Sequence, residues 1–340
     1  MSLTPAMQAV RKGRVTATRI AAIMGLTATS ALEVALSAKS ESGRELDPSW
    51  PLWFGNALER PVAEAYAVAT GTIVFPVKAT FVHPDEDWMA ASPDAIVCDP
   101  VEDVGDGGHC ARSAWTHALP LTDPDDGVLC GLELKTAGHY DKVQEWGGAT
   151  VSPPPTNPTP EYYEAVQRIA EANGDRVPYP YLVQVLWCME VCQLDRWDVA
   201  VLLADHGFQY RQFCVRRTKD TQALIDILKE RGREFWKHYI QGDEVPEPDG
   251  SQSAGRALSG MYQQADRDIV CAMGDEAEWL AEYPAADAAF KEAERERETL
   301  KQLIIGSIGS HEGIETTDGA HRATWKANKN GHRTFRFKGE

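Results

Sequence analysis

The chain has 340 residues, of which 43% are hydrophobic and 25% are charged, so it can form an ordinary packed core and is not wholly disordered. Its formal net charge of −17 argues against a surface coated in basic DNA-binding groups, although a locally basic path stays compatible with it. Seven cysteines without a CxxC pair favour reduced thiols over a disulfide framework. Without a signal-peptide core or an apolar run of membrane-spanning length, we expect a cytoplasmic protein that makes no membrane contact.

Three helices are predicted in the first 70 residues. A short one covers residues 16–25 and begins at a threonine that can cap it. A capping-box pattern at 30–33 opens the second. The third covers 58–70, and because Pro61 is best tolerated in a first turn, Glu59 is expected at or just before the start of that helix.

Strand-like runs follow, rich in β-branched and aromatic residues, at 72–77, 78–82, 95–98 and 128–135. Between the last two, the Asp- and Gly-rich segment 99–127 predicts an acidic surface insertion. A zinc site is an alternative reading of the cysteines and histidines around that insertion, but their spacing matches no standard zinc pattern. These residues are Cys98, His109, Cys110, His117 and Cys130.

The second half of the chain opens with a Pro-rich insertion at 147–175, which itself contains a helix at 161–173. Further elements are a helix at 181–193, a hairpin formed by 198–204 and 209–216, and an amphipathic helix at 219–240. The Gly-, Pro-, Asp- and Ser-rich stretch 242–256 predicts a boundary. Beyond it we expect helices at 257–271 and 284–305, and then a hairpin formed by 323–326 and 334–337 around an Asn330-Gly331 turn.

Three acidic or basic residues stand out against this background. Asp94 follows Ser92-Pro93 and leads into a strand, and Glu133 and Lys135 are two apart on another strand, so they face the same side of it. Each feature alone is more often structural, since such a pair is usually a solvated face and such an Asp a turn. The strand is otherwise apolar, however, and neighbouring carboxylates beside buried elements need cations.

This set suits phosphodiester cleavage. Magnesium prefers hard oxygen ligands, and two or three carboxylates plus a backbone carbonyl can hold one or two such ions. The ions can stabilise the attacking and leaving oxygens of an in-line displacement. A nearby lysine can orient the attacking water and offset the developing negative charge.

Five short motifs, taken in order, resemble those of the YqaJ-type viral recombinases, the phage lambda exonuclease family within the PD-(D/E)xK nuclease superfamily. Each motif is weak alone, but five in the family's order are specific, and the resemblance covers most of residues 8–240. The motifs are Arg11-x-Gly13-x-x-Thr16-Ala17-Thr18, Phe54-Gly55-Asn56-x-x-Glu59, Ser92-Pro93-Asp94, Leu132-Glu133-Leu134-Lys135 and Tyr181-x-x-Gln184-Val185.

The resemblance implies roles for these residues. Asp94, Glu133 and the Leu134 carbonyl would ligate Mg²⁺, for which Mn²⁺ could substitute, and Glu59 would hold a second ion or a metal-bound water. Lys135 would position or activate the attacking water.

Further roles follow from the same resemblance. Gln184 would support Lys135, with Tyr181 beside it as a candidate DNA contact, and Arg11 and Thr18 would bind the 5′-phosphate of the degraded strand. Arginine pairs well with phosphate, and Thr18 lies near a predicted helix N-terminus, where anions bind well.

The expected fold is α/β, with a PD-(D/E)xK restriction-endonuclease-like core: a mixed central sheet flanked by helices. Residues 1–241 would form this nuclease domain, including both insertions, and 257–340 a helical region with a basic β-hairpin. Residues 321–340 hold six Lys and Arg against one acid. Four of these cations are candidate DNA contacts: Arg322, Lys326, Arg333 and Arg336.

The implied activity is that of a Mg²⁺-dependent 5′→3′ double-strand DNA exonuclease of phage or prophage origin. It would act at DNA ends in homologous recombination and generate 3′ overhangs for a single-strand annealing protein. A homotrimeric or homotetrameric ring in the bacterial cytoplasm is expected. The alternatives are a restriction- or repair-type endonuclease of the same fold and a non-catalytic DNA-end-binding protein. Both insertions can reshape the DNA path and so change which DNA ends are accepted.

Overall fold

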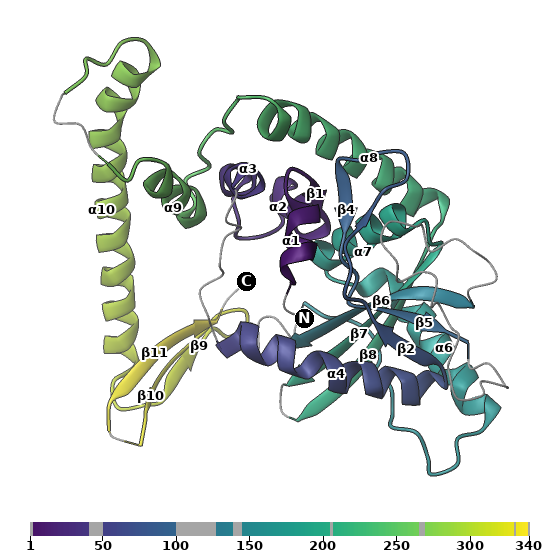
Figure 1. The fold of residues 1–340 in the computed structure, drawn as a ribbon. Helices are drawn as coiled ribbons and strands as arrows, with labels where there is room; N and C mark the ends of the chain where they lie inside the picture. Colours follow the sequence, from purple (N-terminus) through teal and green to yellow (C-terminus); the bar gives the residue numbers. More distant parts are fainter. Residues whose placement is uncertain are drawn as a thin grey trace. The chain divides into compact units, whose positions relative to one another are not determined.

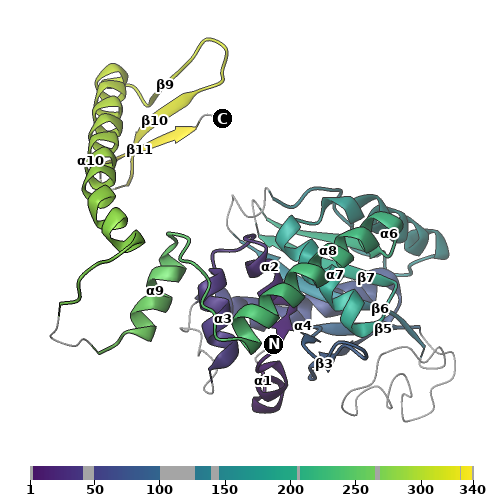
Figure 2. The same cartoon turned by 90° about the horizontal axis from the view of Figure 1, so that it is seen from above.

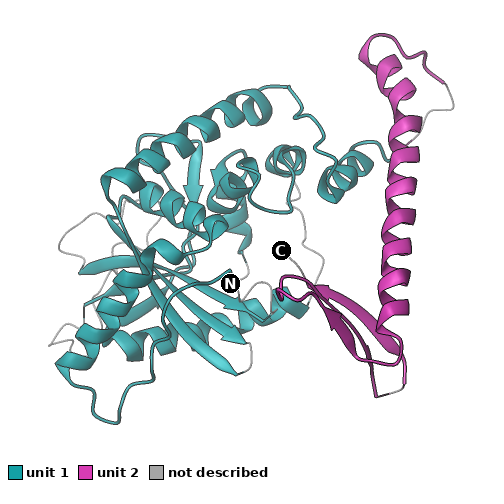
Figure 3. Cartoon of the chain, turned by 180° about the vertical axis from the view of Figure 1, so that it is seen from behind, with its two compact units in different colours: residues 1–263 teal, residues 264–340 magenta. Residues whose placement is uncertain are grey.

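The computed structural model of the chain describes residues 3–40, 50–99, 127–138, 145–204, 207–264, 269–329 and 331–338. The chain divides into two units, residues 1–263 and 264–340 (Figure 3). Helix α9 (Gln252–Met261) packs on α3 (Ala31–Lys39) within the first unit, where the Ser253 hydroxyl accepts the Ser30 N–H at 2.9 Å. Helix α9 therefore begins within the 242–256 stretch and belongs to the first unit, whereas the sequence predicted a helix at 257–271 beyond that stretch.

A five-stranded mixed sheet lies at the centre of the first unit (Figure 1). Its strand order is β2-β5-β6-β7-β8, and only the β6–β7 pair is parallel. The strands are β2 (Ile73–Pro76), β5 (Ala95–Cys98), β6 (Val128–Ala137), β7 (Arg196–Ala204) and β8 (Phe208–Arg216).

Helices cover both faces of this sheet (Figures 1 and 2). Helices α4 (Trp50–Thr70) and α6 (Pro160–Asn173) pack on one face. Helix α7 (Tyr179–Cys192) packs on the other and also contacts α2 (Ala17–Ile23) and α8 (Lys219–Phe235). Ten of the fourteen α7 residues are buried, as expected for a helix between a sheet and two helices.

A small second sheet joins the N-terminal segment to the residues before Asp94. Strand β1 (Val15–Thr16) pairs in parallel with β4 (Met89–Ala91), which pairs antiparallel with β3 (Phe81–Val82). This pairing brings α1 (Pro5–Arg11) and α2 beside the loop that contains Ser92.

Strand β6 alternates between two environments. Cys130, Leu132 and Leu134 pack in the cluster under α4, so Glu133 and Lys135 face α7. Gly131 pairs with Trp197 of β7, and a Cβ at Gly131 would lie 2.4 Å from the buried indole ring. The register that places Glu133 therefore depends on a glycine two residues before it.

The second unit consists of α10 (Asp275–Ile308) and a three-stranded antiparallel sheet, β9 (Gly313–Glu315), β10 (Arg322–Ala327) and β11 (Arg333–Lys338). In the β10–β11 register, Trp325 lies opposite Phe335 and Ala323 opposite Phe337. Directly opposed residues share a face, so the aromatic rings and the buried Ala323 lie on one side of this sheet.

The predicted fold class, a mixed central sheet flanked by helices, is confirmed, whereas several predicted boundaries are wrong. Helix α4 begins at Trp50, so Glu59 lies well inside it rather than at its start, because the exposed Pro61 is accommodated within the helix. Helix α10 begins at Asp275 and likewise contains a proline, Pro284, where the sequence predicted a start at 284. The strands predicted at 72–77 and 78–82 shorten to β2 and β3.

Other differences concern caps, ends and cysteines. Thr16 precedes α2, but its side chain makes no capping hydrogen bond, and β9 adds a strand that was not predicted. The helix predicted at 219–240 ends as a π-helical segment, Trp236–Gln241. Cys98 is disulfide-bonded, contrary to the expectation of reduced thiols, whereas Cys130, Cys188, Cys192, Cys214 and Cys271 are free.

Two predicted features lie outside the described residues: the acidic insertion, of which 100–126 are not described, and Asn330 of the final turn. Within the described part of the chain, every helix is too short or too polar to span a bilayer.

Gly131→Ala should destabilise the protein by roughly 1–3 kcal/mol, because the added methyl overlaps the Trp197 ring in a closely packed core. Urea denaturation measures this loss. Gly138→Ala is the matched control, since a Cβ there meets no atom within 4 Å. Equal stability of the two variants would contradict the close Gly131–Trp197 packing.

Candidate active site

The start of β5 and the middle of β6 bring two carboxylates together. Asp94 immediately precedes β5, and its Oδ2 accepts the Leu134 N–H at 2.9 Å. The N–H and C=O of one strand residue point to the same side, so the Leu134 carbonyl also points toward the side where Asp94 lies. Two carboxylates, Asp94 and Glu133, and one carbonyl therefore gather at this edge of β6.

Glu133 is buried, with 6% of its surface exposed, and its Oε1 forms an ion pair with the Lys135 ammonium. The Lys135 Nζ also lies 5.5 Å from the centre of the Tyr181 ring on α7. A charged pair held this way between a sheet and a helix is fixed in place rather than solvated. The side chains predicted on a common strand face therefore lie together.

Negatively charged groups outnumber positively charged ones at this site. The pKa of Glu133 is raised to about 7, because burial and the Asp94 carboxylate raise it by more than Lys135 lowers it. Burial opposes the charged form of Lys135, yet the Glu133 and Asp94 carboxylates raise the pKa of that ammonium above its ordinary value. Two carboxylates thus face one lysine, and the site gains stability from an additional cation.

Helix α7 presents one face to these groups. Tyr181, Gln184 and Cys188 follow one another at helical spacing, and Gln184 is buried, with 9% of its surface exposed. Burial raises the pKa of the Cys188 thiol, and so does the nearby Glu133 carboxylate. Gln184 therefore lies on the α7 face beside the catalytic candidates, as the resemblance implies.

Glu59 is on α4, which packs on the opposite face of the sheet from Glu133 and Lys135. It lines a pocket of about 780 Å³ together with Asp94 and Leu134, and Lys78 and Trp53 also contribute to the wall. Within the described part of the chain, no group of three His, Cys, Asp or Glu side chains is placed to hold a metal. The structure thus puts Glu59 in the same pocket as Asp94 but not in one three-carboxylate cluster.

The donor set fits a hard divalent cation. Asp94, Glu133 and the Leu134 carbonyl offer only oxygen ligands, which is the preference of Mg²⁺ and Mn²⁺. The raised pKa of Glu133 also fits a cation at this site, because a bound cation would offset the negative charge that burial makes unfavourable.

A second polar cluster lies around Arg11. Its Nη1 donates to the Ser92 Oγ at 3.0 Å, and its Nη2 donates to the Thr16 and Thr18 hydroxyls at 3.3 Å each. Ser92 is only two residues before Asp94. Arg11 and Thr18, which were predicted together, are therefore adjacent, and Ser92 connects their cluster to the segment that contains Asp94.

Three residues of this cluster received no separate role from the sequence: Ser92, Thr80 and Arg19. Ser92 had been quoted only as part of the Asp94 motif, and the Thr80 hydroxyl lies 2.8 Å from its Oγ. Arg19 donates to the backbone carbonyls of Arg11 and Arg14 at 2.8 and 2.6 Å, which fixes the Arg11 backbone. Burial, followed by the charge of Arg11, lowers the pKa of Arg19 to about 10. A serine or arginine near a helix gives no local signal of such distant contacts.

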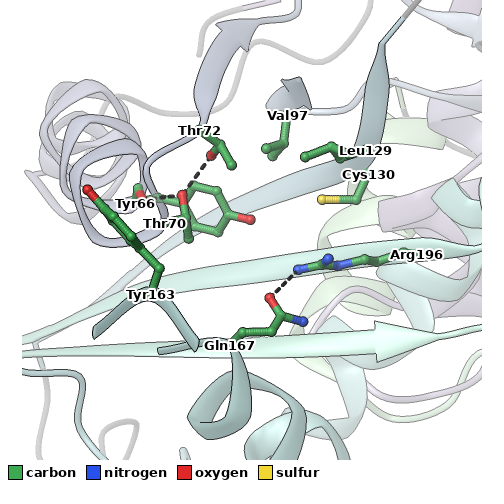
Figure 4. A pocket seen from close by; sticks show the side chains of 9 residues that line it. All are labelled: Tyr66, Thr70, Thr72, Val97, Leu129, Cys130, Tyr163, Gln167 and Arg196. Carbon is green, nitrogen blue, oxygen red and sulfur yellow. Dashed lines mark hydrogen bonds between the residues drawn. The ribbon is translucent and has the colours of Figure 1, made fainter. Parts of the chain in front are cut away.

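A smaller pocket, of about 130 Å³, lies near the start of β6 (Figure 4). Arg196 donates to Gln167 of α6 at 3.0 Å, and Figure 4 shows both side chains facing the pocket. Arg196 also pairs with the fully buried Asp198, whose Oδ2 accepts the Tyr66 hydroxyl at 2.7 Å. These bonds connect α4 and α6 to β7, so we assign the residues around this pocket a structural role.

The cations of the second unit lie on different faces. Arg322, Lys326 and Arg336 occupy the side of the small sheet opposite its aromatic rings, and Lys338 lies directly across from Arg322. Arg333 is on the aromatic side, 3.8 Å from the centre of the Trp325 ring, and donates to the Gly309 and His311 carbonyls. Arg333 thus joins the sheet to the end of α10, and the other cations form the basic face.

Comparison with known proteins identifies a matching family. Residues 7–195 match the family described as YqaJ-like viral recombinase domain. The uncharacterized protein YqaJ of Bacillus subtilis (strain 168) is 21% identical over 216 residues. That alignment covers 63% of this chain and 49% of YqaJ, so the chain matches about half the length of this relative.

Solved structures are also similar at low identity. The crystal structure of an alkaline exonuclease (LHK-Exo) from Laribacter hongkongensis is 19% identical, with a TM-score of 0.41, over 70% of this chain and 95% of that one. A phage-related exonuclease from Haemophilus somnus 129PT is 12% identical, with a TM-score of 0.38, over 69% of this chain and 97% of that one.

The raised pKa of Glu133 predicts a pH-dependent stability when divalent cations are chelated. The folded state holds this proton more tightly than the unfolded chain, whose ordinary value is 4.5. The unfolding free energy should therefore fall as the pH rises from about 4.5 to about 7, and then level off. Glu133→Gln should remove this loss, a difference of more than ~1 kcal/mol between pH 5 and 8 in urea denaturation.

The control for this experiment is Glu64→Gln, because Glu64 is an exposed carboxylate on α4. It should keep the pH dependence of the unsubstituted protein. If Glu133→Gln also keeps that dependence, Glu133 does not ionise as described.

Proposed function

This chain belongs to the YqaJ-like viral recombinase domain family, and on that premise we propose that it is a divalent-metal-dependent nuclease that degrades duplex DNA from its ends. The observation that carries the proposal is the pairing of Asp94 and Glu133 beside the Leu134 carbonyl, with Lys135 on the same strand face as Glu133. This combination supplies metal ligands and a positive charge at one point of the sheet.

Asp94, Glu133 and the Leu134 carbonyl would hold the ion, with Mg²⁺ as the proposed metal and Mn²⁺ as a substitute. Glu59, across the pocket, would hold a second ion or a metal-bound water. A bound ion would neutralise phosphate charge and make a water more acidic. The roughly 780 Å³ pocket between Asp94 and Glu59 leaves room for a phosphodiester group beside these carboxylates.

Lys135 is assigned to orienting the water and countering charge. Its pKa is raised, so the side chain is an ammonium at neutral pH and can donate hydrogen bonds but cannot accept a proton. Tyr181, whose ring lies 5.5 Å from that ammonium, and Gln184 on the same α7 face would restrict its position. Tyr181 is also a candidate DNA contact.

Arg11, Thr18 and Ser92 are proposed to bind the 5′-phosphate of the strand being degraded. The guanidinium already donates to both hydroxyls, and a phosphate oxygen could accept from all three groups. Because Ser92 is two residues from Asp94, a terminal phosphate bound there would lie near the metal site. This supports 5′→3′ exonuclease action over an endonuclease or a non-catalytic end-binding protein.

The wider role is proposed from family membership. An exonuclease of this polarity leaves 3′ overhangs, which in phage or prophage homologous recombination would be used by a single-strand annealing protein. A homotrimeric or homotetrameric ring acting in the bacterial cytoplasm completes this proposal. A ring would let basic groups line the DNA path of a protein whose net charge is −17.

Lys135→Ala and Glu133→Ala should each reduce the digestion of 5′-phosphorylated linear duplex DNA with Mg²⁺ by at least about 100-fold. The first removes a positive charge beside the reacting phosphate, and the second removes a ligand of the proposed metal. Initial rates of nucleotide release measure the effect. Lys219→Ala and Glu230→Ala, both exposed residues on α8, should retain full activity. Undiminished digestion by both active-site variants would refute the assignment, and cutting of closed circular DNA would favour the endonuclease.

Thr18→Val and Ser92→Ala should each reduce the preference for 5′-phosphorylated over 5′-hydroxyl ends by about 10- to 100-fold, the effect of losing one hydrogen bond to a charged group. Rates on the two substrates give this ratio directly. Thr29→Val, an exposed threonine that precedes α3, should leave the ratio unchanged. A preference that survives both substitutions would remove this cluster from end recognition.

The basic face of the small sheet is proposed as a sequence-independent DNA contact. Replacing Arg336 and Lys338 by Gln should weaken duplex binding and reduce the slope of log Kd against log salt by roughly 0.9 for each lost phosphate contact. Lys291→Gln/Arg295→Gln, on α10, is the charge-matched control. An unchanged slope in the sheet variant would exclude this face.

A further inference from the structure

The long helix of the second unit exposes more apolar surface than a lone helix usually does. Helix α10 has 34 residues, a length of about 51 Å at 1.5 Å per residue. Its small sheet covers only the last turns, where Ile308 is fully buried. Trp279, Tyr283 and Phe290 are exposed by 63%, 71% and 66%. Within the described residues of this unit, nothing packs over them.

Five large apolar residues of α10 follow a regular pattern, and the exposed Leu280 and Leu303 lie beside it. These five residues fall on steps of three and four when Ala286, Ala293 and Arg297 are included, which is the heptad spacing of coiled coils: Trp279, Tyr283, Phe290, Leu300 and Ile304. They form one stripe along the helix. We call the residues from Trp279 to Ile304 that occupy these positions the heptad stripe.

Charge along α10 is distributed unevenly. Residues 275–289 hold five acidic residues and no basic one, whereas residues 290–304 hold four of each. A parallel, in-register pair would place the two acidic halves side by side. An antiparallel pair would instead place each acidic half against the half that holds all the basic residues, which lowers repulsion.

Side-chain sizes agree with the antiparallel arrangement. When the heptad stripe is aligned about its midpoint, Phe290 lies opposite Ala293 of the second copy and Tyr283 opposite Leu300. Ala286 then lies opposite Arg297, the charged residue of the stripe, and a long arginine stem can cover an alanine while its head reaches the acidic half. Large residues thus face smaller ones along the stripe.

We propose that the heptad stripe of α10 binds the same helix of a second copy of this chain, forming an antiparallel coiled coil. This inference goes beyond the nuclease proposal and does not depend on it. If the first units also form rings, the coiled coil links two rings or two separate chains. The pairing also explains how a helix exposed along most of its length, with Pro284 inside it, is stabilised.

The first test measures the mass of the full chain by sedimentation equilibrium. The mass should be an even multiple of the 37.5 kDa chain, and Tyr283→Glu/Phe290→Glu should halve it. Both residues are largely exposed, so the substitutions leave the chain itself folded, which circular dichroism verifies. Ala281→Glu/Ala288→Glu adds the same charge on the opposite side of α10 and should leave the mass unchanged. An odd multiple, or a mass unaffected by both double substitutions, overturns the proposal.

The second test determines the direction of the two helices by disulfide trapping in a Cys271→Ser background, which removes the exposed thiol among the free cysteines of the described residues. Ala286→Cys/Arg297→Cys should form an interchain disulfide in high yield, whereas each single substitution should not, because like positions are about 16 Å apart along an antiparallel pair. The same chain cannot join the two positions, which are eleven residues apart on one helix. Cross-linking of Ala286→Cys alone indicates a parallel pair and contradicts the proposal, as does the absence of any cross-link.

Discussion

The structure depends on holding two carboxylates together at a buried sheet edge with only one lysine to balance them. Asp94 is fixed by the Leu134 N–H, and Glu133 is buried beside Lys135. Burial and the neighbouring carboxylate raise the pKa of Glu133 to about 7. Such an arrangement is unfavourable for folding alone, and it becomes useful when a divalent cation supplies the missing positive charge.

The surrounding elements keep this charge arrangement in place. Strand β6 carries core residues on one face and the catalytic candidates on the other, and the Gly131–Trp197 contact sets its position against β7. Asp198, buried between Tyr66 and Arg196, ties α4 to the sheet, so the helix that contains Glu59 is anchored below it. The β1–β4 pairing then brings the Arg11 cluster to Ser92, beside the same edge.

The predictable part of the site was local in sequence. Alternation of Leu132, Glu133, Leu134 and Lys135 on a strand shows the shared face directly, whereas Ser92 meets Arg11 across 81 positions through strand pairing that no short pattern reveals. The start of α4 was wrong because propensity places a proline in a first turn, and tertiary packing overrides that preference at Pro61. Strand β9 was not predicted because three residues that begin with glycine carry no strand signal. The strand forms through its antiparallel pairing with β10.

Metal binding tests the central claim most directly, since the proposed catalytic roles depend on the Asp94–Glu133 pair acting as a ligand set. Calorimetric titration of the full chain with Mn²⁺ should detect saturable binding. Asp94→Asn should weaken it by at least about 10-fold, while Asp175→Asn, an exposed carboxylate beyond α6, should leave it unchanged. Binding of equal strength in Asp94→Asn and the unsubstituted protein would contradict the account.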